Sequence, residues 1–290
     1  SSNLHLLRLV REQGARVDAV SLGEIERALR AGFRPGGVTA DIVYTSDVID
    51  DATLDRVVSL GIPVNAGSED MLDQLGRRQR GHPVWLRVNP GFGHGHSRKT
   101  NTGGESSKHG IWHANLDGAA KKLDEHGLDL VGLHMHIGSG ADFEHLQRVG
   151  AAMLSQVRSL GRDLRAISAG GGLPVPYRAG DARLDIAAYF EVWNAARRSI
   201  EAELGHEVQL EIEPGRYLVA ESGLLLAEVR AIKTVGGNRF VLVDAGFDGT
   251  LVSNQTGSGI VLYEIRLGPF DTLEEAQRVG TVVQSAHGLT

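Results

Sequence analysis

The sequence predicts an α/β fold, a (β/α)8 barrel of the TIM type whose first strand is missing. Short β-branched runs alternate with longer amphipathic stretches, which predicts a parallel sheet. Seven strand candidates are found, and the first element is a helix. A closed barrel needs eight strands, each followed by a helix, so the chain starts one strand late. An open doubly wound sheet is the alternative that this pattern leaves open.

Each element has its own local signal. Leu4, Leu7 and Val10 recur at helical spacing, which predicts an opening helix. Ser21 and Glu24 form a capping box at the start of the next helix. The predicted strands lie near Val17–Val20, Ile42–Tyr44, Pro63–Ala66, Val84–Val88, Leu130–His136, Ala166–Ser168 and Gln209–Ile212.

The pattern changes after the barrel. We expect a barrel over residues 1–216, strands over 217–248 that follow one another without a helix, and a divergent tail over 249–290. Thr250–Gly259 is polar and rich in Gly and Ser, which indicates a linker. The strand candidates of this part are Leu224–Lys233, Arg239–Asp244 and Ile260–Leu267.

Composition excludes several classes of function. The net charge of −6 gives no electrostatic reason for binding nucleic acid or an anionic membrane. The absence of cysteine excludes a disulfide scaffold and a zinc-thiolate site. No apolar run approaches the roughly 20 residues of a membrane span, and no signal peptide opens the chain, so we expect a cytoplasmic protein.

The first candidate motif lies at the end of a predicted strand. His134 and His136 are two residues apart, so they share one face, expected to be the barrel interior. The pair could ligate a metal, or one imidazole could pack against a planar cofactor while Gly138 and Ser139 turn toward its phosphate. Hydrogen-bonded core histidines are the plain structural alternative.

Two further motifs end later strands. Gly170, Gly171 and Gly172 directly follow a strand, and their backbone N–H groups are expected to be free for an oxyanion, although glycine runs often only make tight turns. Glu213 could hold a proton on a ring nitrogen, and Arg216 could pair with a phosphate or carboxylate, against the alternative of an ordinary ion pair. Adjacent late barrel strands often hold a phosphate site.

A long glycine-rich stretch follows the strand near Val84–Val88. It contains His94 and His96 and runs on to Ser107-Lys108-His109-Gly110. Long loops after barrel strands are usually functional. His94 and His96 suggest a metal, but a surface histidine pair is the preferred interpretation.

Seven segments in order resemble one family. They are VDAVSLGEIERALRAGF, VNAGSEDMLDQLG, WLRVNPGFGHGHSRKTNTGGESSKHGIW, GLHMHIGSG, SAGGGLPVPY, LEIEPGRYLVAESG and FVLVDAGF. From Ser1 to about Asp248 the chain resembles bacterial diaminopimelate decarboxylase. The resemblance implies an alanine racemase-like barrel that binds pyridoxal 5'-phosphate, a C-terminal β domain, a homodimer, and conversion of the amino acid meso-2,6-diaminopimelate to L-lysine.

The resemblance also implies roles for individual residues. His136 would stack on the pyridine ring, and Glu213 would keep its nitrogen protonated. Asp18, Arg87, Lys108 and His134 would line the same pocket. The phosphate would be held by Ser139, Gly170, Gly171, Gly172, Gly215 and Arg216. No metal is implied.

Three features depart from the family pattern. The lysine that carries the cofactor in the family aligns just before Ser1, and no lysine within the chain replaces it. The R-P-x-M-Y segment with a substrate-binding arginine is absent after Asp248, as is the family's catalytic cysteine. We therefore expect this chain alone to be a truncated or inactive form of the enzyme.

Two alternatives stay open. A metal-dependent barrel hydrolase could use His134 and His136, but it needs further ligands on other strands. A non-catalytic barrel with a cell-wall tail is the other alternative, because Tyr263–Asp271 resembles the start of a SPOR domain, a peptidoglycan-binding module.

Overall fold

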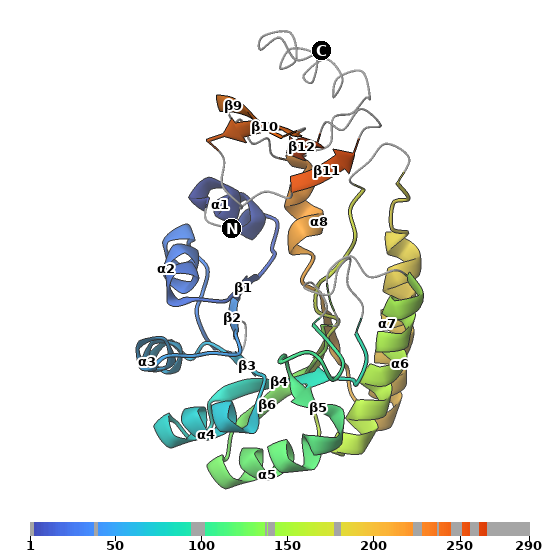
Figure 1. Cartoon of the computed structure of the whole chain (residues 1–290). Helices are drawn as coiled ribbons and strands as arrows, with labels where there is room; N and C mark the ends of the chain where they lie inside the picture. The colour runs from blue at the N-terminus through green and yellow to red at the C-terminus, as the bar shows by residue number, and fades with distance from the viewer. Residues whose placement is uncertain are drawn as a thin grey trace. The chain divides into compact units, whose positions relative to one another are not determined.

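The structure is a computed structural model of the 290-residue chain. It describes residues 3–37, 40–93, 102–136, 138, 143–176, 181–222, 228–236, 238–244, 251–255 and 261–265. The chain divides into two compact units (Figure 1). The first comprises Ser1–Pro174 and Leu184–Pro214, and the second comprises Val175–Arg183 and Gly215–Thr290. None of the described helices is long and apolar enough to cross a membrane.

A parallel sheet forms the centre of the first unit. Its strand order is β1-β2-β3-β4-β6-β7-β8, and the short β5 pairs with β4. Each predicted barrel strand is present, so the expectation of a barrel that begins with a helix is confirmed for the described residues. The strands are β1 (Val17–Ala19), β2 (Ile42–Thr45), β3 (Val64–Ala66), β4 (Pro83–Asn89), β5 (Ile111–Trp112), β6 (Asp129–His134), β7 (Ala166–Ser168) and β8 (Gln209–Glu211).

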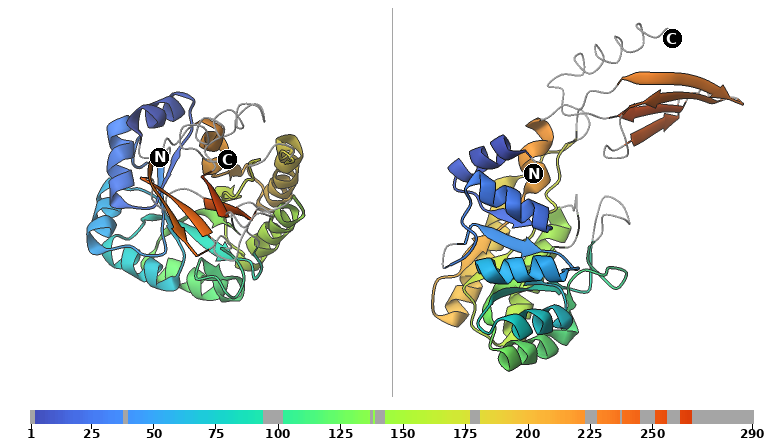
Figure 2. Two further views of the ribbon diagram at one scale, coloured as in Figure 1. Left: turned by 45° about the horizontal axis from the view of Figure 1, so that its top comes forward. Right: turned by 90° about the vertical axis from the view of Figure 1, so that its left-hand side faces the viewer.

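Helices cover the outside of this curved sheet (Figure 2). Ser21 caps the second helix through its hydroxyl, which accepts from the Glu24 N–H at 3.3 Å, and Gly32 ends that helix in the left-handed conformation. The helices are α1 (Leu4–Glu12), α2 (Leu22–Ala31), α3 (Asp51–Leu60), α4 (Glu69–Arg78), the 3-10 turn η2 (His113–Asn115), α5 (Leu116–His126), α6 (Phe143–Leu160) and α7 (Ile186–Leu204).

The core lies between these helices and the sheet. Its largest fully buried side chains come from both layers, such as Ile25, Leu54 and Met153 from helices and Leu86 and Leu133 from strands. Burial on both faces explains why the strands are apolar runs rather than alternating ones. Because all strands of the sheet run parallel, their carboxyl ends share one edge, and the predicted site residues gather there.

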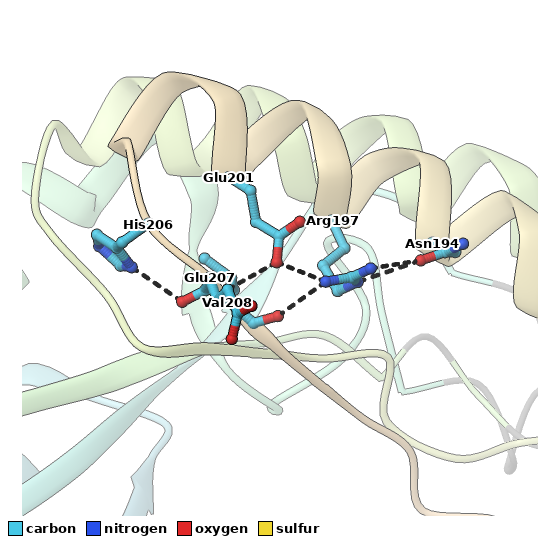
Figure 3. Close-up of polar contacts among 6 residues, drawn as sticks. All are labelled: Asn194, Arg197, Glu201, His206, Glu207 and Val208. Carbon is cyan, nitrogen blue, oxygen red and sulfur yellow. Dashed lines mark hydrogen bonds and ion pairs between the residues drawn. The ribbon is translucent and has the colours of Figure 1, made fainter.

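A polar network fixes the start of β8 against α7 (Figure 3). The Glu201 carboxylate accepts from the Val208 N–H at 2.9 Å and also from the Arg197 guanidinium. Arg197 in turn donates to Asn194 Oδ1 at 2.8 Å. The network therefore ties the amino end of β8 to the helix that precedes it.

The second unit is described by itself. It contains α8 (Gly215–Val219), the 3-10 turn η3 (Ala220–Ser222), and four strands that form two antiparallel pairs. Strand β9 (Val229–Val235) pairs with β10 (Asn238–Val243), as the prediction of consecutive strands requires. Strand β11 (Leu251–Gln255) pairs with β12 (Val261–Ile265).

The structure differs from the expected elements at three places. Residues 217–222 were expected to belong to strands, but they lie in helix α8 and the 3-10 turn η3. Strand β5 was not predicted, because two residues carry no periodicity; it exists only through pairing of Val88 with Ile111. The predicted linker at Thr250–Gly259 is wrong over Leu251–Gln255, which is a strand. Pairing with Val261–Ile265 supplies the backbone partners that local composition could not predict. The remainder of the SPOR-like segment lies outside the described residues.

Candidate active site

A cavity of about 340 Å³ opens at the carboxyl ends of the barrel strands. All its lining residues belong to the first unit. They are Asp18, Val20, Thr45, Ser46, Asp47, Val48, Arg87, Lys108, His109, His134, His136 and Glu213. The size suits a small organic molecule, and most of the lining residues are polar or charged.

Glu213 is the central acid of the cavity. His134 Nε2, on β6, lies 2.9 Å from Glu213 Oε1, and His136 Nδ1 lies 4.0 Å from Glu213 Oε2. Burial raises the pKa of Glu213, but the imidazoles of His134 and His136 and the charge of Arg87 outweigh it, so the net pKa is lowered. The pocket therefore holds an ionised carboxylate, the form able to bind a cationic ring nitrogen.

His136 is held as a neutral ring. Burial and the neighbouring His134 lower its pKa to about 4. The Gly171 N–H donates to His136 Nδ1 at 2.8 Å, which leaves the ring proton on Nε2. The backbone carbonyl of His136 accepts from Thr102 Oγ1 at 3.0 Å. The imidazole is thus a fixed, uncharged plane on the cavity wall.

The glycine run after β7 corrects one expectation. Its N–H groups were expected to be free, but Gly170 donates to Ser168 Oγ at 3.2 Å and Gly171 donates to His136. A Cβ at Gly171 would lie 2.5 Å from the Glu213 carbonyl oxygen and 3.2 Å from His136 Cε1. Two of the three glycines therefore serve close packing of β6, β7 and β8, which the sequence could not distinguish from anion binding. Gly172, at φ 90°, makes no hydrogen bond through its N–H within the described part of the chain.

Asp18 and Arg87 lie in the same cavity. Burial and the charge of Glu213 raise the pKa of Asp18 well above its usual value, against the opposing effects of Thr45 and Arg87. These effects favour the protonated form of Asp18 beside Glu213, and the cation Arg87 lines the same cavity.

The cavity mouth contains a pair that sequence reasoning did not single out. Asp47 follows β2, and its Oδ2 contacts Nδ1 of His109, which lies beside Lys108 in the segment after β4. Asp47 could have been found by its position, because it follows the predicted strand Ile42–Tyr44 at the end where barrel sites lie. Only the fold brings His109 to it.

Five predicted residues lie outside the described part of the first unit. Ser139, His94 and His96 lie outside the described residues. Gly215 and Arg216 begin α8, in the second unit.

The described residues contain one group with the potential to bind a metal, and it lies elsewhere. Asp73, Glu125 and His126 bring their ligand atoms within 4.8 Å of one another on α4 and α5. The ammonium of Lys122 already lies 3.2 Å from Asp73 and 3.0 Å from Glu125, so a cation is present among these carboxylates. His134 and His136 belong to no such group within the described ranges.

Comparison with known proteins identifies the family. Residues 1–220 match the family described as "Pyridoxal-dependent decarboxylase, pyridoxal binding domain". The chain is 65% identical over 257 residues to diaminopimelate decarboxylase of Streptomyces coelicolor, and 59% identical over 284 residues to that of Escherichia coli strain K12. These alignments cover 89% and 97% of this chain. The chain belongs to the diaminopimelate decarboxylase family.

Solved structures of the family agree with the fold. A crystal structure of diaminopimelate decarboxylase, 63% identical, matches with a TM-score of 0.79 over 85% of this chain. A Helicobacter pylori family member complexed with L-lysine, 27% identical, matches with a TM-score of 0.73 over 92% of this chain and 75% of its own. This chain spans 58% of the Streptomyces relative and 67% of the Escherichia relative.

The cavity fits the family's cofactor, pyridoxal phosphate, on observations of its own. It presents a neutral imidazole plane at His136, an ionised buried carboxylate at Glu213, and a backbone at Gly171 too close to its neighbours for any side chain. A flat, cationic heteroaromatic ring can stack on a neutral imidazole and pair with an ionised carboxylate.

Proposed function

We propose that this chain supplies the cofactor-binding barrel of an enzyme that removes CO2 from meso-2,6-diaminopimelate to give L-lysine. The arrangement of Glu213 between His134 and His136, in a cavity at the strand ends, carries the proposal. The 59% to 65% identity to diaminopimelate decarboxylases supports the same substrate. The family members solved with L-lysine bind the product of that reaction.

Each pocket residue has a proposed role toward pyridoxal phosphate. His136 would lie against the pyridine ring, and Glu213 would accept the hydrogen bond of its protonated nitrogen. When bound, the cofactor withdraws electrons from the carbon that loses CO2. The phosphate would meet the Gly172 N–H, and Ser139, Gly215 and Arg216 remain predicted partners for it.

The remaining groups would tune charge in the cavity. The raised pKa of Asp18 favours its protonated form, so Glu213 would be the carboxylate that pairs with the ring nitrogen, since two ionised carboxylates in one site repel each other. Arg87 would orient a polar substituent of the ring or a substrate carboxylate. The homodimer and the cytoplasmic location belong to the same proposal. The hydrolase alternative is not favoured, because the group of potential metal ligands found among the described residues excludes His134 and His136.

Equilibrium binding of pyridoxal phosphate tests the proposal. We expect the full chain to bind pyridoxal phosphate reversibly. Quenching of the fluorescence of the chain's 3 tryptophans measures this binding. Glu213→Gln should weaken binding about tenfold, because it removes a charge-assisted hydrogen bond worth roughly 1.5–3 kcal/mol. Glu207→Gln, at an exposed site, is the matched control. Equal affinity of Glu213→Gln and the original chain would contradict the assignment.

Activity requires a second test. A chimera in which residues 1–248 replace the matching segment of the Escherichia coli relative should release CO2 from meso-diaminopimelate. A chimera that folds and binds pyridoxal phosphate but turns over only another amino acid would refute the proposed substrate.

A further inference from the structure

Asp47 and His109 form a pair at the cavity mouth to which no role is assigned above. Nδ1 of His109 contacts Oδ2 of Asp47, and the two side chains are 28% and 17% exposed. Both residues line the cavity. They come from different elements, the end of β2 and the segment after β4. The fold therefore brings them together, although they lie far apart in the sequence.

Glycines beside the pair leave room for this contact. A Cβ at Gly67 would lie 2.9 Å from Asp47 Oδ1, so glycine leaves the room that the carboxylate occupies. Gly110, at φ 80°, lets the chain after His109 turn against β4, where a Cβ would lie 3.0 Å from the Asn89 nitrogen. Ser107 Oγ accepts from the His109 N–H at 3.2 Å. Residues that follow β2, β3 and β4 therefore pack around the contact between Asp47 and His109.

The orientation of His109 leaves one nitrogen for chemistry. Nδ1 is buried against the carboxylate, whereas Nε2 is neither buried nor hydrogen-bonded within the described residues. A carboxylate on Nδ1 of a histidine fixes the tautomer and direction of the ring, and Nε2 then exchanges protons. His109 lines the cavity, and Nε2 is therefore its solvent-accessible ring nitrogen.

The proposed decarboxylation needs such a proton. When the bond between carbon and carboxylate breaks, CO2 leaves and the electron pair stays on carbon, so each turnover consumes one proton there. Nδ1 of His136 already accepts from the Gly171 N–H and the ring has a pKa of about 4, while Nε2 of His134 lies against Glu213. The other titratable and charged groups that line the cavity with His109 are Asp18, Asp47, Arg87, Lys108, His134, His136 and Glu213.

We propose that His109, oriented by Asp47, delivers a proton from Nε2 to the carbon that loses CO2. The N–H bond of the imidazolium breaks as the C–H bond forms, and solvent water returns a proton to Nε2. Asp47 acts as the positioning residue. The inference rests on the proposed function, since it concerns the proton that this reaction consumes.

The first test uses the full chain without cofactor. Long-range 1H–15N NMR should show the neutral ring of His109 protonated at Nδ1, and Asp47→Asn should remove that preference. The same tautomer mixture in both proteins would overturn the positioning role of Asp47.

The second test follows the reverse proton transfer. The full chain with pyridoxal phosphate and L-lysine in D2O should exchange the lysine α-proton for deuterium. General acid–base catalysis contributes roughly 10²–10⁴-fold, so His109→Gln should slow exchange by about 10²-fold while the affinity for pyridoxal phosphate is unchanged. His113→Gln, on the same segment but outside the cavity lining, is the matched control.

The outcomes separate this inference from the proposed function. Equal exchange rates in His109→Gln and the original chain would overturn the inference. Loss of exchange in Lys108→Met with normal exchange in His109→Gln would overturn it as well. Absence of exchange in a chain that binds pyridoxal phosphate would also count against it. Failure of the original chain to bind pyridoxal phosphate would instead refute the proposed function.

Discussion

The two ends of the barrel strands carry different kinds of residue. At the carboxyl ends lie titratable side chains such as Asp18, His134 and Glu213, which surround a cavity. At the amino ends of β3, β4, β6, β7 and β8, a residue one or two positions before the strand is buried in the core. These residues are Ile62, His82, Leu128, Leu164 and Val208. The difference shows that stability and chemistry occupy opposite ends of the same sheet, as barrel enzymes generally arrange them.

This separation predicts that substitutions at the two ends have different consequences. Changes at the carboxyl ends should alter ligand binding, and changes at the amino ends should alter stability alone. Three substitutions test it, in order of the expected effect.

Gly171→Ala should have the largest effect, because its Cβ would lie 2.5 Å from backbone at Glu213. Overpacking of this kind costs roughly 1–3 kcal/mol, and displacement of the His136 ring should abolish pyridoxal phosphate binding. Fluorescence titration and urea unfolding measure the two effects. Gly23→Ala is the control, since its Cβ would meet only Ser21 Oγ, at 4.0 Å. Normal affinity in Gly171→Ala would show that the glycine is not required by the site.

Glu201→Ala tests the amino end. It leaves the Val208 N–H and the Arg197 guanidinium without their shared acceptor (Figure 3). Loss of such a partner costs roughly 1–3 kcal/mol, so we expect about 2 kcal/mol of lost unfolding free energy in urea denaturation. Glu203→Ala, on the same helix with an exposed partner in Arg158, should cost less than about 1 kcal/mol. A large loss of pyridoxal phosphate affinity in Glu201→Ala would break the separation of the two ends.

His82 should give the smallest effect, one that depends on pH. Burial lowers its pKa in the folded state, and contact with the Ile62 backbone offsets part of the change. As pH falls below about 6.5, the unfolded chain takes up a proton that the folded chain refuses, so stability is lost until the lowered folded pKa is passed. One such group contributes a slope of at most about 1.4 kcal/mol per pH unit. Urea denaturation between pH 7.5 and 5 should show a shallower slope for His82→Gln, and identical slopes would contradict this prediction.

The sequence predicted the sheet because each strand carried its own signal. Val84–Val88 and Ala166–Ser168 are apolar runs bounded by glycine or polar turns, and burial on both faces requires such runs. The pair of strands β11 and β12 was predicted only in part, because Leu251–Gln255 is stabilised by its partner rather than by its composition.

The site was predictable where its residues share a strand. His134 and His136 lie two apart, so the spacing alone put them on one face, and both line the cavity. Asp47 and His109 were not predictable as a pair, because only the parallel order of β2, β3 and β4 brings them together. The hydrogen bond from the Gly171 N–H to His136 could not be predicted either, because a run of glycines does not indicate which acceptors its N–H groups face.

That single amide hydrogen bond has a consequence for how protons move in the cavity. With Nδ1 accepting from Gly171, His136 has no lone pair to offer the ligand, and its low pKa keeps a second proton away at physiological pH. The ring therefore carries no net charge. It gives the cavity a flat surface whose charge does not change near neutral pH.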